Sequence, residues 1–181
     1  VQDTEVYEQH SSHNRTFWIK GYDGQEKEVT GYRGDGSTMG CRALPVEDAR
    51  FLVNISLPCK LHTFIDPFAG SGGIIHAAKY IREDLYVISA DIDPVLEPGL
   101  KRYSDEHYVI NSRHLKLKGK KLDAIVTVVP FYKGAMSDIL ETLTNLSAYL
   151  NDNGRVVIMC APEQQKALLS HMHDEGYYNY A

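Results

Sequence analysis

The sequence predicts an α/β domain built on a doubly wound, mostly parallel β-sheet with helices on both faces, preceded by a small β-hairpin extension. From residue 45 onward, segments of strand length alternate with segments of helical periodicity. The strand segments are almost continuously apolar, which is typical of parallel strands buried on both faces. The chain has 181 residues, which fits one domain at roughly 150 residues per domain.

The predicted strands of the sheet are 61–66, 85–91, 107–110, 122–128 and 155–160. The first two predicted helices are 46–56 and a segment that is capped by Ser71 and carries the apolar stripe Ile74, Ala77, Ala78 and Ile81. A short helix begins at Pro94, and the next is marked by Ile139, Leu143, Leu146 and Leu150. The last predicted helix begins at Pro162 and ends with a C-cap at Gly176. Such a sheet usually continues further, so we expect a short C-terminus or a strand supplied from elsewhere.

The first part of the chain has a different pattern. Residues 1–14 are polar and predict a loose arm, whereas 15–20 and 27–33 flank a turn-rich segment at 21–24 and predict a hairpin. Residues 34–40 predict a loop. We therefore expect an arm and hairpin over 1–44 and the main domain over 45–181.

Composition excludes several classes of protein. The chain is 43% hydrophobic and 24% charged, which is an ordinary globular balance. Its net charge of −5 is not that of a protein that holds nucleic acid by its body alone. It lacks a run of about 18 apolar residues and begins without a signal-peptide pattern, so we expect no membrane contact and a cytoplasmic location.

The cysteines and histidines do not indicate a metal site. Cys41, Cys59 and Cys160 are odd in number and far apart, which indicates reduced thiols rather than disulfides. The eight histidines form no paired ligand motif. We expect no bound metal.

A glycine-rich turn follows the first predicted strand. In Asp66-Pro-Phe-Ala-Gly-Ser-Gly-Gly73, three glycines would let the backbone approach a ligand closely, and the helix that follows presents free N–H groups. A ligand carboxylate suits that helix end, while the Asp66 carboxylate would hold an ammonium group. The alternative is a turn that only reverses the chain.

The second strand ends at Asp91, about 20 residues after the turn. An acidic residue at this point is placed to accept hydrogen bonds from ribose hydroxyls. The alternative role is a helix N-cap, which Asp93 before Pro94 fits better. The glycine spacing departs from the dinucleotide pattern, because Ile75 stands where its last glycine would be.

These segments resemble class I S-adenosylmethionine-dependent methyltransferases, which have a Rossmann-like fold. The stretch IDPFAGSGGIIHAA of 65–78 resembles their first motif, and SADIDP of 89–94 resembles the second. The form DPFxGSGG is closest to RNA methylases that modify exocyclic base amines, many of which carry an N-terminal THUMP module. The similarity extends over about residues 30 to 180.

The resemblance implies a function and a set of residues. It implies methylation of a base amine in RNA, such as tRNA or rRNA, with a partner subunit or RNA-binding module supplied elsewhere. The implied residues for S-adenosylmethionine are Asp66, Pro67, Phe68, Gly70, Ser71, Gly72, Gly73, Asp91, Ile92 and Asn111, with Asp91 on the ribose and Ile92 and Asn111 near the adenine.

The fourth motif departs from the family pattern. The family has Asp or Asn, two prolines and an aromatic residue, whereas this chain has Val128-Val129-Pro130-Phe131-Tyr132. The catalytic candidates are therefore Pro130, Phe131 and Tyr132. Phe131 and Tyr132 would stack a flipped base or serve as ordinary packing. Val128 has no side-chain acceptor for an amine, and it also fits the buried end of a strand.

Two further alternatives remain open. A degenerate, non-catalytic methyltransferase-fold subunit is favoured by Val128, and a small-molecule methyltransferase is favoured by the acidic net charge. The basic run from Arg113 to Lys121 precedes the fourth strand, so we expect it at the amino ends of the strands, as a solvated loop or an RNA contact.

Overall fold

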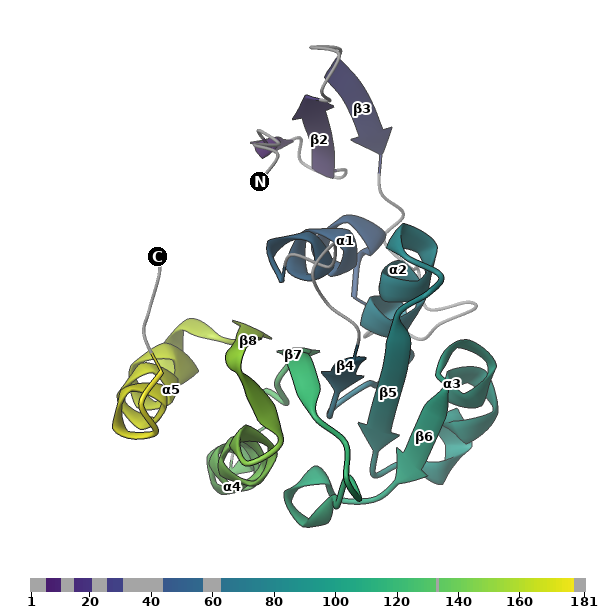
Figure 1. Ribbon diagram of the computed structural model, residues 1–181. Helices are drawn as coiled ribbons and strands as arrows, with labels where there is room; N and C mark the ends of the chain where they lie inside the picture. The colour runs from purple at the N-terminus through teal and green to yellow at the C-terminus, as the bar shows by residue number, and fades with distance from the viewer. Residues whose placement is uncertain are drawn as a thin grey trace.

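The structure is a computed structural model, which describes residues 6–10, 15–20, 26–30, 44–56, 63–132 and 134–177. Its main element is a five-stranded sheet in which every pairing is parallel, with helices flanking it (Figure 1). The strand order is β6-β5-β4-β7-β8. The strands are β4 (Thr63–Asp66), β5 (Tyr86–Asp91), β6 (Glu106–Val109), β7 (Leu122–Val128) and β8 (Leu150–Met159). The doubly wound α/β prediction is confirmed.

Helices connect most successive strands of this sheet, whereas only a 3₁₀ turn lies between β6 and β7. The helices are α1 (Val46–Ile55), α2 (Gly73–Ile81), α3 (Glu97–Tyr103), α4 (Ala135–Ser147) and α5 (Pro162–Asp174), with the 3₁₀ turns η2 (Pro94–Leu96) and η3 (Ser112–His114). Successive side chains of a strand point to opposite faces of the sheet. Accordingly, Phe64 packs with α1, α2 and α3 on one face, while Ile65 packs with Leu146 of α4 on the other.

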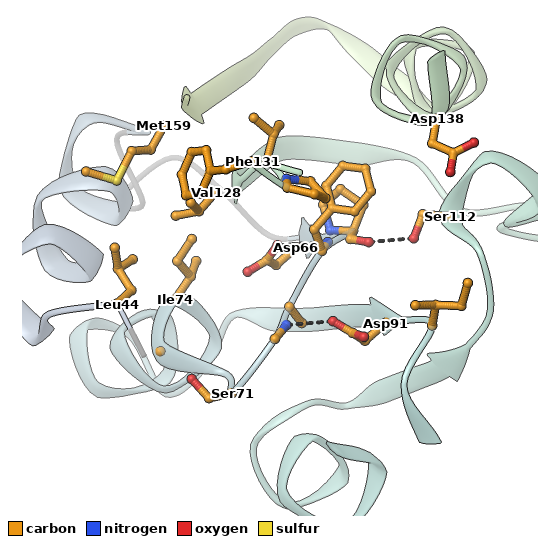
Figure 2. A pocket seen from close by; sticks show the side chains of 18 of the residues that line it. Leu44, Asp66, Ser71, Ile74, Asp91, Ser112, Val128, Phe131, Asp138 and Met159 are labelled. Carbon is orange, nitrogen blue, oxygen red and sulfur yellow. Dashed lines mark hydrogen bonds between the residues drawn. The ribbon is translucent and has the colours of Figure 1, made fainter. Parts of the chain in front are cut away.

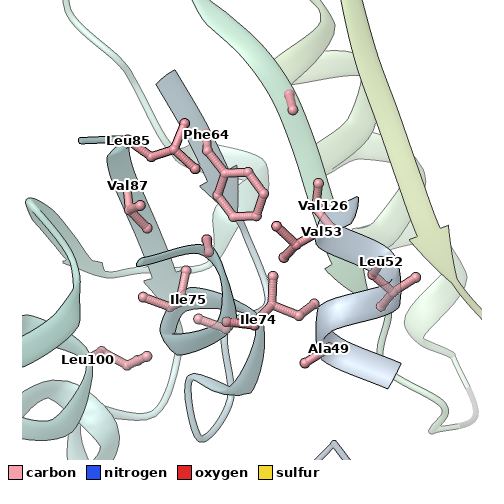
Figure 3. Packing of buried hydrophobic residues seen from close by; sticks show 14 residues of the cluster. Ala49, Leu52, Val53, Phe64, Ile74, Ile75, Leu85, Val87, Leu100 and Val126 are labelled. Carbon is pink, nitrogen blue, oxygen red and sulfur yellow. The ribbon is translucent and has the colours of Figure 1, made fainter. Parts of the chain in front are cut away.

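The core on the first face joins α1 and α2 to the central strands (Figure 3). Val53 of α1 and Ile75 of α2 are each 0% exposed, and both pack in the same cluster as Phe64 and Val126. On the other side, Ile139 of α4 and Leu168 of α5 pack around Val129, which follows β7. The sheet is thus buried on both faces, as its apolar strands predict.

The strand order changes direction at β4. From β4 the chain proceeds through β5 to β6 at one edge, then returns to β7 on the other side of β4 and continues to β8. In open α/β sheets, ligands bind beyond the carboxyl ends of the strands at such a switch point. The segments that follow β4, β5 and β7 therefore meet where a binding site is expected.

The first part of the chain forms a separate antiparallel sheet of three strands in the order β1-β2-β3. These are β1 (Val6–His10), β2 (Arg15–Lys20) and β3 (Glu26–Thr30). The β2–β3 pairing confirms the predicted hairpin. The prediction of a loose arm over 1–14 was wrong for β1, which pairs with β2 along its whole length.

Other boundaries also differ from the prediction. Ser71 is not the N-cap of α2: Gly72 takes that place with φ +85°, and no side chain caps the helix. Leu150 is not helical but begins β8, because α4 already ends at Ser147. The predicted end of the last helix differs less from the structure: α5 ends at Asp174, and Gly176, the predicted C-cap, adopts φ +83° two residues later.

Several predicted features lie outside the described residues: the turn at 21–24, hairpin residues 31–33, the loop at 34–40, strand residues 61–62, and Cys41 and Cys59. Within the described part of the chain, every helix is too short or too polar to cross a membrane.

Candidate functional site

A cavity of about 1130 Å³ lies at the carboxyl ends of the strands, at the switch point (Figure 2). Its walls come from the segments after β4, β5, β6 and β7, with Met159 at the end of β8 and Leu44 before α1. Typical small-molecule sites enclose about 300–1,000 Å³, so this cavity is large enough for a nucleoside-sized ligand and part of a second molecule.

The cavity brings together nearly all the residues predicted from the motifs. Nine of the ten predicted cofactor residues line it: Asp66, Pro67, Phe68, Gly70, Ser71, Gly73, Asp91, Ile92 and Asn111. The predicted catalytic residues Pro130, Phe131 and Tyr132 line it as well, together with Val128. Gly72 is the predicted residue that is not part of the wall.

The two glycines of the turn that have positive φ values differ in their roles. Gly70 and Gly72 have φ values of +51° and +85°, which residues with a side chain rarely adopt. A Cβ at Gly72 would lie 3.1 Å from the Leu100 side chain, whereas at Gly70 the nearest atom would be 4.0 Å away. Gly72 therefore packs against α3 and is not part of the cavity wall. Gly70 is the glycine that borders the cavity.

Asp91 ties the glycine turn to the end of β5. Its Oδ2 accepts a hydrogen bond from the Gly70 N–H at 2.8 Å (Figure 2). Its Oδ1 accepts one from the Asp93 N–H at 2.9 Å. A carboxylate offers about four acceptor positions, so each oxygen retains capacity for a ligand hydroxyl. Asp93 instead caps η2 by accepting from the Val95 N–H, as the sequence predicts for this residue.

Asp66 is a buried carboxyl group at the centre of the site. It is 2% exposed, and its Oδ1 accepts hydrogen bonds from the Thr127 hydroxyl at 2.6 Å and the Phe68 N–H at 3.1 Å. Its pKa is raised to about 7, chiefly by burial and to a smaller extent by the nearby charge of Asp91, while the two hydrogen bonds oppose this shift. A buried carboxyl of this kind becomes fully ionised when a cation binds beside it.

The segment after β6 closes the cavity beside Asp91. The Asn111 side chain accepts a hydrogen bond from the Arg113 N–H at 3.3 Å and so caps η3. The Ser112 hydroxyl donates to the Pro67 carbonyl, which links this segment to the one after β4. Asn111 therefore has a structural role in addition to the predicted contact with adenine.

The opposite end of the cavity is apolar. Four side chains converge there: Leu44, Ile74, Val128 and Met159 (Figure 2). Val128 ends β7 and is partly buried against the same core as α1 and α2. The next residue, Val129, is 1% exposed and packs its side chain with Ile139 on the other side. Val128 is therefore the end of a strand, as considered from the sequence, but it is only partly buried and presents a methyl surface to the site.

Phe131 and Tyr132 lie at the mouth of the cavity. Their exposed fractions are 61% and 60%, which is high for aromatic side chains that line a cavity. Of the two roles considered from the sequence, this exposure favours a stacking surface over ordinary packing.

The basic run from Arg113 to Lys121 was expected at the amino ends of the strands, but its first residue lies elsewhere. Arg113 follows the carboxyl end of β6, and its Nη1 donates to Oδ1 of Asp138, a cavity residue, at 2.9 Å. Expecting the whole run at the amino ends was therefore wrong for Arg113. Lys120 does precede β7, where it pairs with Glu106.

Sequence reasoning missed several residues of the site, namely Leu44, Ile74, Thr127, Ser112, Asp138 and Met159. The Thr127–Asp66 hydrogen bond spans 61 positions of sequence, so no local pattern signals it. Met159 reaches the site because it is the partner of Val128 in the parallel register, which the structure shows and the sequence does not. Among the described residues, no cluster of His, Cys, Asp and Glu is arranged to hold a metal ion.

Comparisons with known proteins identify the fold. No family model and no curated protein matches the chain. Among solved structures, TrmN from Thermus thermophilus matches 92% of this chain and 51% of its own, with a TM-score of 0.62 and 19% identity. Precorrin-6y C5,15-methyltransferase from Geobacter metallireducens matches 73% of this chain and 72% of its own, with a TM-score of 0.59 and 12% identity.

A third similar structure is the plantazolicin methyltransferase BpumL in complex with SAH. It matches 70% of this chain and 50% of its own, with a TM-score of 0.54 and 15% identity. The chain thus spans about half the length of BpumL and of TrmN. These similarities show that the chain has the α/β Rossmann-like fold of methyltransferases.

Proposed function

We propose that the chain binds S-adenosylmethionine and transfers its methyl group to a nucleic-acid base amine, most simply in tRNA or rRNA. The observation that carries the proposal is the pair Asp66 and Asp91, which stand at the carboxyl ends of adjacent strands on either side of the glycine turn. The methyltransferase fold supports it, and one similar structure, TrmN, is a tRNA methyltransferase.

The residues present fit both the charged amino-acid part of this cofactor and its polar ribose. Asp66 is buried with a raised pKa, which suits a partner for the α-ammonium group, and the start of α2 presents main-chain N–H groups to the carboxylate. The remaining acceptor positions of Asp91 suit the ribose hydroxyls. Ile92, which is 67% exposed, and Asn111 would border the adenine.

Bound S-adenosylmethionine supplies a methyl group on a positively charged sulfur, and a nucleophile attacks the methyl carbon while the sulfur leaves as a neutral thioether. The protein has to align the nucleophile with that methyl group, because alignment supplies much of the rate of such reactions. Phe131 and Tyr132 would stack the base that carries the amine. The apolar surface of Val128 and Met159 would exclude water from the point of transfer.

An amine nucleophile also needs a hydrogen-bond acceptor, which draws its N–H away from the ring and exposes the lone pair. Val128 offers no side-chain acceptor, at a cost on the order of 3 kcal/mol, or about a hundredfold in rate. The main chain of Val129 takes this role in our proposal. Because the Val129 side chain is buried with Ile139, the part of this residue that lines the cavity is its backbone.

A small-molecule acceptor is the second candidate. The convergence of Leu44, Ile74, Val128 and Met159 favours it, because an apolar wall binds a compact apolar substrate as well as it shields a base. A non-catalytic subunit is the third candidate, favoured by Val128 itself. We also propose that further RNA-binding surface is supplied from outside this domain, either by residues 1–44 or by a partner.

One experiment separates the three candidates. Purified protein is incubated with methyl-labelled S-adenosylmethionine and bulk tRNA, with rRNA and a small-molecule panel in parallel. Label in a base amine of RNA supports the proposal, and label only in a small molecule supports the second candidate. Cofactor binding without any transfer supports the non-catalytic subunit.

A further inference from the structure

The side chain of Gln164 joins the start of α5 to the turn that follows β7. Gln164 is the third residue of α5 and is 9% exposed. Its Oε1 accepts a hydrogen bond from the Ala161 N–H at 3.0 Å, and its Nε2 donates one to the Pro130 carbonyl at 2.8 Å. An amide that meets a donor at one end and an acceptor at the other has only one orientation that satisfies both.

Gln164 also ends the hydrogen-bond ladder between β7 and β8. The last ladder bond runs from the Val129 N–H to the Met159 carbonyl at 3.0 Å. In a parallel pair with this register, the next bond would run from the Ala161 N–H to the Val129 carbonyl. Because Oε1 of Gln164 takes the Ala161 N–H instead, the Val129 carbonyl is left outside the ladder.

The turn is held in three places. At one end the Val129 N–H bonds to β8, and at the other the Ala135 N–H donates to the Tyr132 carbonyl at 3.1 Å, where α4 begins. Gln164 fixes the middle through Pro130, which has no N–H of its own. The backbone acceptor and the aromatic pair of the proposed site therefore share an anchor that comes from α5.

We propose that Gln164 is a positioning residue for methyl transfer. It diverts the Ala161 N–H, which releases the Val129 carbonyl as the acceptor for the substrate amine, and it fixes Pro130, which sets the position of Phe131 and Tyr132. This inference rests on the proposed function. It assigns to α5, an element that does not line the cavity, a direct effect on the reacting geometry.

The test compares Q164M, Q164E and the matched control Q165M. Methionine has nearly the same length as glutamine but makes neither hydrogen bond. At pH 8 the Q164E carboxylate still accepts from the Ala161 N–H but cannot donate to Pro130, whereas its protonated form can. Gln165 is the next residue of the same helix and is exposed, so Q165M controls for the loss of a glutamine from α5.

The first readouts are label transfer to bulk tRNA and the dissociation constant of S-adenosylmethionine. For Q164M and Q164E at pH 8 we expect the saturated rate to fall by about tenfold or more, while cofactor affinity stays within about twofold. Because burial raises the pKa of a carboxyl group, the rate of Q164E relative to wild type should rise as the pH is lowered from 8 towards 5. Unchanged rates in both variants, or a parallel loss of cofactor affinity and melting temperature, would overturn the inference.

A second readout does not depend on the substrate. Amide hydrogen exchange at Phe131 and Tyr132 should be faster in Q164M than in Q165M, with exchange in β4 and β5 unchanged. If wild-type protein labels no RNA, the proposed function fails, and this exchange pattern then decides whether Gln164 fixes the turn. Equal exchange in the two variants overturns the positioning role whatever the substrate.

Discussion

The Thr127 hydroxyl donates a 2.6 Å hydrogen bond to Oδ1 of Asp66, which joins the carboxyl ends of β7 and β4 at the switch in strand order. The two residues are 0% and 2% exposed. The Phe68 N–H also bonds to Oδ1, so both hydrogen bonds use the same carboxylate oxygen. Oδ2 lies outside this pair of bonds and is the oxygen that would meet a ligand cation.

Asp66 should make the stability of the fold depend on pH. Its pKa is raised from 3.8 to about 7, so the folded protein holds a proton that the unfolded chain releases. This contribution to the free energy of unfolding is fully present below pH 3.8, is lost as the pH rises to about 7, and amounts to about 4 kcal/mol at most. Asp66→Asn should therefore be more stable than wild type at pH 8 but not at pH 4, as measured by urea unfolding.

The same substitution should weaken the binding of S-adenosylmethionine, because a neutral amide cannot form an ion pair with the ammonium group of the cofactor. The amide oxygen that the substitution introduces can still accept from Thr127 and Phe68, so the turn should keep its shape. If Asp66→Asn lowers stability at pH 8 while cofactor affinity is unchanged, Asp66 is a structural carboxylate and not a ligand for the cation.

The two αL glycines should separate stability from binding. Gly72→Ala should destabilise the fold by about 1–2 kcal/mol, because an alanine at φ +85° is strained and its Cβ meets Leu100. Gly70→Asn should be tolerated in the fold, since asparagine accepts φ +51° with open space around it, but should weaken cofactor binding. Thermal unfolding and calorimetry measure the two effects. A reversed pattern would mean that Gly72, not Gly70, faces the ligand.

Much of the fold is predictable from the sequence because its signals are local. The apolar strands and the helical stripes each lie within one element, and the two aspartates and the glycine turn lie at strand ends, where parallel topology gathers them. The boundary at Leu150 was missed because this residue continues the stripe of α4, although the chain there enters β8. β1 was missed because its sequence VYEQH is mostly polar.

The contacts that orient the site could not be predicted, because their partners are far apart in the chain. The bond from Gln164 to Pro130 spans 34 positions, and the bond from Ser112 to Pro67 spans 45. Each joins two segments that meet only after the sheet has formed. A sequence pattern identifies the residue types at strand ends, but not which of these residues already satisfy one another.

Asp91 and Asp93 should differ in their effects. Asp91→Ala should weaken S-adenosylmethionine binding by about 1.5–3 kcal/mol, because it removes the ribose acceptor and also the partner of the Gly70 N–H. Asp93→Ala removes the cap of η2 and should cost about 1 kcal/mol of stability, with a smaller effect on binding. Titration calorimetry on both variants measures this. The opposite order would show that the ribose carboxylate is misassigned.

Val128 distinguishes an enzyme from a non-catalytic subunit. If an amine is the substrate, Val128→Asn adds a side-chain acceptor beside it, and label transfer to tRNA should rise while cofactor affinity stays nearly constant. In a non-catalytic subunit the variant should gain no activity and should lose stability, because its amide lies partly buried among Ile74, Leu44 and Met159 without a partner. The Val128→Leu variant keeps the apolar wall and serves as the control.

Titration calorimetry with S-adenosylmethionine at pH 6, in two buffers of different ionisation enthalpy, tests cofactor binding at Asp66 most directly. The group has a pKa of about 7 in the free protein, so it is mostly protonated at pH 6 and must lose its proton to pair with the ammonium group. We predict one-to-one binding with release of about 0.9 proton, and no such release in Asp66→Asn. The absence of binding, or binding with the same proton release in both proteins, would contradict the assignment of this cavity to S-adenosylmethionine.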